Sequence, residues 1–136
     1  MQVNIVGPMV CAKHAVRAMS TARGGKGGSI VTIASGAARA PAGLPGIVPY
    51  AAAKGRSGDI RARPVQRVAS EGIGVNSVSP WVIATDMAFP EAQEAAKHSP
   101  LGRMGQPEEI AATVSWVISP EASFVTHSDI SVSGGL

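Results

Sequence analysis

The 136-residue chain has one cysteine, one tyrosine, two phenylalanines and two tryptophans. A single cysteine, Cys11, excludes an internal disulfide and is typical of a reducing compartment, so we expect a cytoplasmic location. With aromatics at 4% of residues, the core must consist mainly of Val, Ile, Ala, Met and Leu. The basic residues form no run, which argues against nucleic-acid binding. Lys13 and Arg17 interrupt the apolar start, and no stretch of membrane-spanning length remains.

Apolar periodicity predicts helices that alternate with short strands. A helical stripe over roughly residues 3 to 20 is formed by Ile5, Met9, Ala12, Val16 and Met19. The predicted strands are 29–35, 74–79 and 129–133, and further helices are expected from residue 50 towards 70, around 91–97 and after residue 106. This order indicates an α/β fold, with a Rossmann-like parallel sheet, flanking helices and right-handed crossovers. About three strands and three to four helices make a small parallel sheet, so we expect an incomplete one.

The stretch YAAAK places Tyr50, the only tyrosine, four residues before Lys54. Positions i and i+4 share one face of a helix. A tyrosine phenol titrates near pH 10, and a nearby cation favours its ionised form, so such a pair can act as a general acid and base. The alternative is structural, with Tyr50 capping the helix end and Lys54 pointing to solvent.

Ser35 ends the first predicted strand, and functional residues gather at the carboxyl ends of strands in open α/β sheets. A serine there can equally satisfy a turn. Together, the segments GGSIVTIAS, YAAAK, EGIGVNSVSPWVIATDM, PLGRMGQPEEIAATVSWVISPEASFVT and ISVSGG resemble, in content and order, the short-chain dehydrogenase/reductase family. The likeness extends from Asn4 to Gly135 and is similar in character to the 3-oxoacyl carrier-protein reductases.

The resemblance implies a role for each matching residue. Tyr50 would be the acid/base towards a carbonyl or alcohol substrate, Lys54 would assist it and bind the nicotinamide ribose, and Ser35 would hold the substrate oxygen. Asn4 would distort its helix locally and hold a water in a proton relay. The alternative for Asn4 is a helix N-cap.

The resemblance also implies a cofactor, NAD or NADP. Pro80, Ile83 and Thr85 follow the second strand in the place of the family's nicotinamide-binding segment. The backbone of Ile83 would meet the carboxamide, and the hydroxyl of Thr85 would lie by the carboxamide or the pyrophosphate. Such a cofactor carries the hydride chemistry, and the protein orients it.

The family's glycine-rich phosphate-binding turn after its first strand has no counterpart before Asn4. The segment RGGKGG precedes a strand, whereas a phosphate loop follows one, so we interpret it as a connector. We therefore expect residues 1–136 to form a single, truncated domain that corresponds to the C-terminal half of the family domain. The adenosine side of NAD or NADP accordingly has no visible binding site in this sequence.

Three further departures from the family concern two single positions and one segment. Trp81 stands where the family has a glycine near the nicotinamide and could block that position, and His127 stands where a glycine commonly follows Val-Thr. Residues 55–69 replace an amphipathic helix with an arginine-rich segment that contains Pro64, which a helix interior disfavours. The histidines His14 and His98 have no metal-ligand partners at suitable spacing, so we expect no metal site.

These observations leave three hypotheses for function. The chain is an NAD(P)-dependent oxidoreductase that acts on a small carbonyl or alcohol substrate, or a catalytically inactive truncated remnant, or a module that docks on a related subunit. In the family, the helices that begin near Asn4 and Tyr50 form the main subunit interface, so the resemblance implies a homo-oligomer through them.

Overall fold

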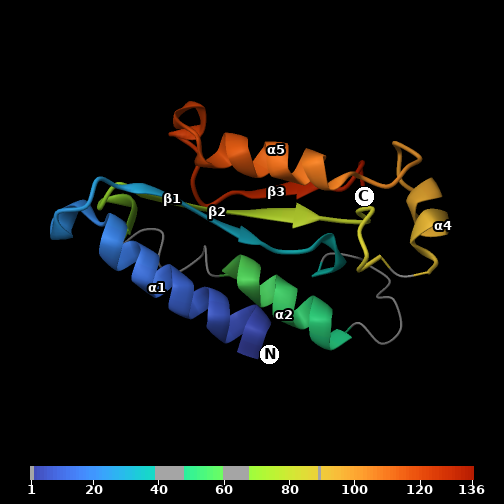
Figure 1. The fold of residues 1–136 in the computed structure, drawn as a ribbon, viewed down its shortest axis with the longest axis horizontal. Helices are drawn as coiled ribbons and strands as arrows, with labels where there is room; N and C mark the ends of the chain where they lie inside the picture. The colour runs from blue at the N-terminus through green and yellow to red at the C-terminus, as the bar shows by residue number, and fades with distance from the viewer. Residues whose placement is uncertain (1, 39–47, 60–67, 89) are drawn as a thin grey trace.

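Figure 1 shows the fold in a computed structural model, which describes residues 2–38, 48–59, 68–88 and 90–136. The elements in chain order are η1 (Gln2–Val6), α1 (Gly7–Met19), η2 (Thr21–Arg23), β1 (Gly28–Ile33), η3 (Gly36–Ala38), α2 (Val48–Asp59), β2 (Ile73–Pro80), α4 (Ala92–Lys97), α5 (Pro107–Ile118), η4 (Pro120–Ala122) and β3 (Asp129–Val132). The predicted strands and helices are confirmed, with two qualifications. The helix expected towards residue 70 is described only to Asp59, and Pro64 lies outside the described residues.

The three strands form one sheet in the order β1-β2-β3, and both neighbouring pairs are parallel. Residues 28–33 of β1 pair in register with residues 73–78 of β2. The central strand β2 is buried along almost its whole length, as expected for a parallel strand with both faces covered. This arrangement confirms the predicted Rossmann-like α/β class and its small size.

Helices cover both faces of this sheet (Figure 1). The hydroxyl of Ser29 donates to the carbonyl of Val117 on α5 at 3.3 Å, whereas the next residue, Ile30, packs with Val16 and Met19 of α1. Successive strand residues point to opposite faces, so α5 and α1 lie on opposite sides. The core on the α1 side contains Val68, Ile73 and Val75.

The two crossovers have opposite hands. The connection from β1 to β2 passes through α2, on the same side of the sheet as α1, and the connection from β2 to β3 passes through α5 on the other side (Figure 1). The expectation of right-handed crossovers throughout is therefore wrong for one of the two. The handedness rule applies to a helix that packs directly back on its strand, but residues 81–106, with α4, separate β2 from α5.

The predicted inner stripes of two helices are largely confirmed. On α5, Val117 is buried, and Ile110 and Val114 are partly buried. On the first helix, Met9 is 55% exposed, although the other members of its stripe are partly buried. Met9 lies on a side of α1 that the sheet does not cover.

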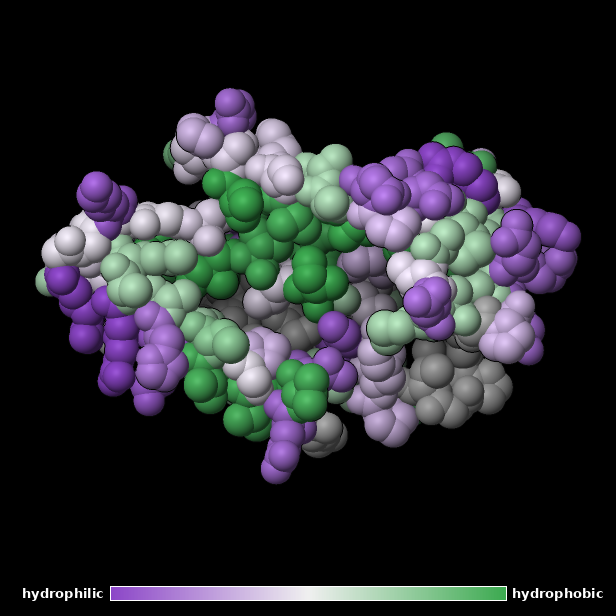
Figure 2. Space-filling model, viewed as in Figure 1, coloured by the Kyte–Doolittle hydropathy of each residue, from purple (hydrophilic) through white to green (hydrophobic). Residues whose placement is uncertain are grey.

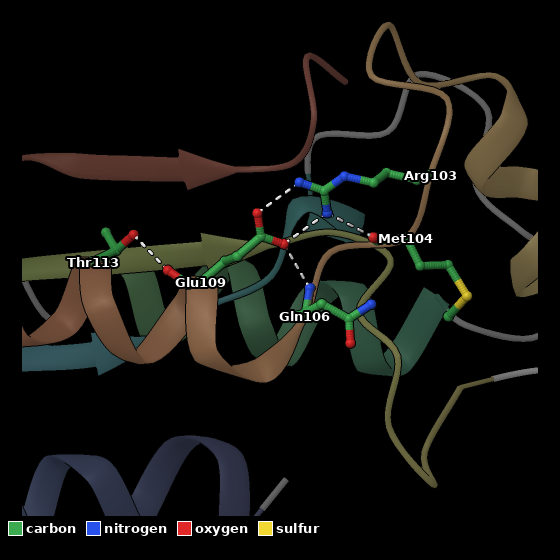
Figure 3. Close-up of polar contacts among 5 residues, drawn as sticks. All are labelled: Arg103, Met104, Gln106, Glu109 and Thr113. Carbon is green, nitrogen blue, oxygen red and sulfur yellow. Dashed lines mark hydrogen bonds and ion pairs between the residues drawn. The ribbon is translucent and has the colours of Figure 1, made fainter.

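Polar contacts fix the start of α5 (Figure 3). The two Arg103 guanidinium nitrogens Nη1 and Nη2 donate to the two carboxylate oxygens of Glu109 at 2.8 and 2.7 Å. The backbone N–H of Gln106 donates to the same carboxylate at 2.8 Å. The Arg103 hydrogen bonds, followed by the one from Gln106, lower the pKa of Glu109 from 4.5 to about 2.

We therefore expect the Glu109 carboxylate to titrate with a midpoint near pH 2 in an NMR titration of the side-chain carboxyl carbons. Because the folded-state pKa lies below the unfolded value, the contribution of this group to stability is present above pH 4.5 and is lost as the pH falls towards 2. Glu109→Gln should remove that pH dependence, whereas Glu108→Gln, on the same helical turn, should leave it in place. A Glu109 midpoint near 4.5 would contradict the assignment.

His127 occupies the left-handed region of backbone space, with φ at 58°. Its N–H donates to the carbonyl of Val75 at 2.8 Å, which ties the turn before β3 to β2. For a residue other than glycine, this conformation costs roughly 1–2 kcal/mol of free energy. The conformation gives a physical reason for the glycine that the resemblance places here.

The outer edge of β1 has no partner strand within the described residues. Figure 2 shows apolar surface gathered between α5 and α1 on the side of the molecule that this edge faces. Ile33, the last residue of β1, is 44% exposed. In the described ranges, no helix is both long and apolar enough to cross a membrane.

Candidate active site

Helix α2 places Lys54 against the carboxyl end of β1. The Nζ of Lys54 donates a hydrogen bond to the carbonyl oxygen of Ile33 at 3.0 Å. The side chain therefore turns towards the sheet, and the alternative in which it points to solvent is wrong. Burial lowers the pKa of Lys54 below its ordinary value of 10.5, because partial desolvation disfavours the charged form.

Tyr50 lies in the first turn of α2, one turn before Lys54 on the same face of the helix. Its side chain is 39% exposed, so a ligand can reach it. The helix begins at Val48, which places Tyr50 inside the helix rather than at a cap position. Helix α2 also contacts η1, η3 and β1, and these elements carry or adjoin the other predicted site residues.

Ser35 follows β1 and precedes η3 at the carboxyl edge of the sheet. Its Oγ accepts a hydrogen bond from the N–H of Ala37 at 3.2 Å. The Ser35 hydroxyl thus satisfies a turn, which is the structural alternative for this residue. In that turn the hydroxyl acts as a hydrogen-bond acceptor. A serine hydroxyl also has one proton to donate, so this contact leaves the donor function for a substrate oxygen.

Asn4 lies within the π-helical turn η1 at the start of the first helix. This confirms a local distortion at Asn4. The N-cap alternative is wrong, because α1 begins at Gly7 and its N-cap residue is Val6. Asn4 and Lys54 line one cavity of about 260 Å³ between α1 and β1, together with residues that include Pro8 and Cys11. The structure therefore brings the predicted relay residues Asn4 and Lys54 to a common space.

The segment after β2 is held by a short parallel bridge between Ile83 and Gly105. The N–H of Ala84 donates to the carbonyl of Gly105 at 2.9 Å, and the N–H of Gly105 donates to the carbonyl of Val82 at 3.0 Å. In a parallel bridge of this kind, the N–H and C=O of the intervening residue face the other way. The backbone polar groups of Ile83 are thus directed away from Gly105, which suits a ligand such as a carboxamide. Thr85, two residues on, is exposed.

Within the described residues, the glycine-rich segment RGGKGG does not form a phosphate-binding turn. Gly27 and Gly28 enter β1 at its amino end, which confirms that RGGKGG is a connector. A Cβ on Gly27 would lie 2.5 Å from the carbonyl oxygen of Gly72. The space beside Gly27 is therefore filled by the backbone of Gly72, and it leaves no room for a phosphate group.

Comparison with known proteins decides the family. The family model described as "Enoyl-(Acyl carrier protein) reductase" matches residues 1–136. The chain is 38% identical to the uncharacterized oxidoreductase YgfF of Escherichia coli K12, over 99% of this chain and 56% of that protein. The chain belongs to the short-chain dehydrogenase/reductase family. It is also 34% identical to the 3-oxoacyl-[acyl-carrier-protein] reductase FabG of Vibrio cholerae, over 100% of this chain and 55% of that protein.

Solved structures of short-chain dehydrogenases and reductases share the fold. BdcA in complex with NADPH superposes with a TM-score of 0.87 at 30% identity, covering 99% of this chain and 54% of the other. Solved members carry NADP, NADPH or NADH, so NAD(P) is the cofactor of the family. The chain spans about half the length of the curated relatives that it matches.

Sequence reasoning missed three residues that shape the site. Pro8 and Cys11 line the cavity shared by Asn4 and Lys54, and only the fold reveals this. Gly36 packs against Trp81, although the two are 45 residues apart in the chain. In the sequence, the glycine directly after Ser35 was the feature that could have indicated a close contact at this position.

Proposed function

We propose that this chain carries the nicotinamide and substrate end of an NAD(P)-dependent oxidoreductase that acts on a small carbonyl or alcohol compound. The observation that supports this most is the hydrogen bond from Lys54 to Ile33, because it holds the YAAAK helix over the carboxyl end of β1. Bound NAD(P)H would supply the hydride. Residues 1–136 would correspond to the C-terminal half of the family domain, which agrees with their share of the relatives' length.

Each site residue then has a role set by its position. Tyr50 would give a proton to the carbonyl oxygen during reduction and take it back during oxidation, and the Lys54 ammonium would favour the phenolate. Ser35 would donate a hydrogen bond to the same substrate oxygen. Asn4 would hold a water in the shared cavity, and that water would exchange protons with Lys54.

Pro80, Ile83 and Thr85 would hold the nicotinamide carboxamide and its surroundings. Lys54 and Tyr50 would also contact the nicotinamide ribose. The bridge to Gly105 supports this assignment, because it orients the backbone of Ile83.

A homo-oligomer would form through the helices that begin near Asn4 and Tyr50. Val3, Val6 and Val10 are 83%, 52% and 48% exposed, and their spacing puts them on one side of the first helix. Contiguous exposed apolar patches are typical of contact surfaces, which supports this side of the helix as the interface. The single free thiol, Cys11, supports a cytoplasmic location.

Calorimetric titration of the folded chain with NADH and NADPH tests the proposal. We expect saturable binding of at least one nucleotide, and Lys54→Met should weaken it. Lys97→Met is the matched control, because Lys97 is an exposed lysine on α4 that pairs only with the neighbouring Glu94 in the described contacts. If a chain that retains its helical circular dichroism binds neither nucleotide, the non-catalytic remnant or docking module is favoured instead.

A further inference from the structure

The indole of Trp81 lies directly on the backbone of Gly36. A Cβ built on Gly36 would come within 2.7 Å of Cε3 of Trp81, 3.3 Å of the carbonyl oxygen of Pro80 and 3.4 Å of Cβ of Trp81. The φ angle of Gly36 lies outside the left-handed range, so its backbone conformation does not itself require a glycine. The contact with the indole therefore explains the glycine.

The backbone of Trp81 is tied to the end of β3. The N–H of Trp81 donates to the carbonyl of Val132 at the end of β3 at 3.2 Å. Separately, the N–H of Ala34 donates to the carbonyl of Val78 at 2.8 Å and continues the β1-β2 pairing one residue beyond β1. The indole consequently reaches from the end of β2 across the end of β1.

This position lies within the candidate active site. Gly36 is the residue after Ser35, and Trp81 is two residues before Ile83, whose backbone groups face away from their bridge partner. Trp81 is only partly buried, so the residue keeps some accessible surface at this edge. A flat apolar ring of the predicted nicotinamide segment thus lies against the chain that follows β1.

Building on the proposed function, we propose that the Trp81 indole forms a wall of the nicotinamide end of the site and stacks on the pyridinium ring. A cationic aromatic ring is attracted to the face of an indole, and stacked rings add contact area. Gly36 is then a positioning residue, since its missing side chain is what allows the indole to lie there.

The probe for this proposal is nicotinamide mononucleotide, which has the pyridinium ring, ribose and one phosphate but no adenosine. Trp116→Phe leaves Trp81 as the single tryptophan, and Trp81→Phe leaves Trp116, which is 46% exposed on α5. Pyridinium rings quench indole fluorescence on contact. We expect saturable quenching in the Trp116→Phe protein and no saturable quenching in the Trp81→Phe protein.

Calorimetry with the same probe measures the affinity directly. Trp81→Ala should weaken binding by about fivefold, the size expected for one cation–π contact. Gly36→Ala should weaken binding as well, because its Cβ would displace the indole. Gly7→Ala is the matched control, since a Cβ at Gly7 meets only an ordinary contact at 3.7 Å.

The outcomes separate this inference from the proposed function. If calorimetry shows that the probe binds while Trp81 emission does not change, stacking on Trp81 is refuted and the proposed nicotinamide site is retained. Tighter binding in Trp81→Ala would mean that the indole obstructs the site, which also refutes stacking. If a folded chain shows no binding of the probe at all, the nicotinamide site and its wall are refuted together.

Discussion

Tyr50→Phe is expected to lower the rate of carbonyl reduction by about 10²–10⁴-fold, the usual contribution of a positioned acid or base. The substitution removes only the phenolic hydroxyl, and the ring keeps its place in the first turn of α2. Because the side chain is 39% exposed, the free energy of unfolding should change by no more than about 0.5 kcal/mol. The rate is measured as oxidation of NADH or NADPH in a preparation that turns over a carbonyl compound.

The control for Tyr50 is a second conservative change at an exposed aromatic residue, Trp116→Phe on α5. It should leave turnover unchanged, since α5 covers the opposite face of the sheet from α2. Urea unfolding of both variants separates a loss of chemistry from a loss of fold. Turnover in Tyr50→Phe at the level of the original chain would contradict the assignment of Tyr50.

Asn76→Ala is expected to lower the free energy of unfolding by about 3 kcal/mol, because it leaves two polar groups without a partner. Asn76 is fully buried in the central strand β2. Its Nδ2 donates to the carbonyl of Val125 at 2.8 Å, and its Oδ1 accepts from the N–H of Ser128 at 3.1 Å. These bonds hold the turn before β3, which also contains the left-handed His127.

Urea denaturation measures this loss as a lower midpoint with an unchanged slope. Gln93→Ala is the matched control, because Gln93 carries the same amide group on the exposed side of α4. That control should change stability by less than about 0.5 kcal/mol. A cost below about 1 kcal/mol for Asn76→Ala would show that the turn before β3 does not depend on the amide.

Local pattern was enough to predict the elements of this fold. The β-branched run of β1, the apolar positions 110, 114 and 117 of α5, and Pro107 with two glutamates in its first turn each specify their element through short-range physics. Alternation of these elements then predicted the parallel sheet. The same reasoning placed Ser35 at a strand end and Tyr50 with Lys54 on one helix face.

Long-range packing was not predictable from the same patterns. The side of the sheet on which α5 lies depends on the path of residues 81–106, and no periodicity encodes that path. The contact between Gly36 and Trp81 depends on the register of β1 with β2 and on the space that a glycine leaves. The roles of the site residues, as distinct from their positions, stay predictions.

The hydrogen bond between Lys54 and Ile33 connects α2 to β1, so this lysine has a structural role as well as its proposed catalytic role. A variant that shortens or neutralises Lys54 would therefore loosen α2 and move Tyr50 at the same time. Loss of turnover in such a variant reports the sum of a displaced phenol and a missing charge. Tyr50→Phe isolates the proton transfer better, because among the described contacts no hydrogen bond ties the Tyr50 phenol to a neighbouring element.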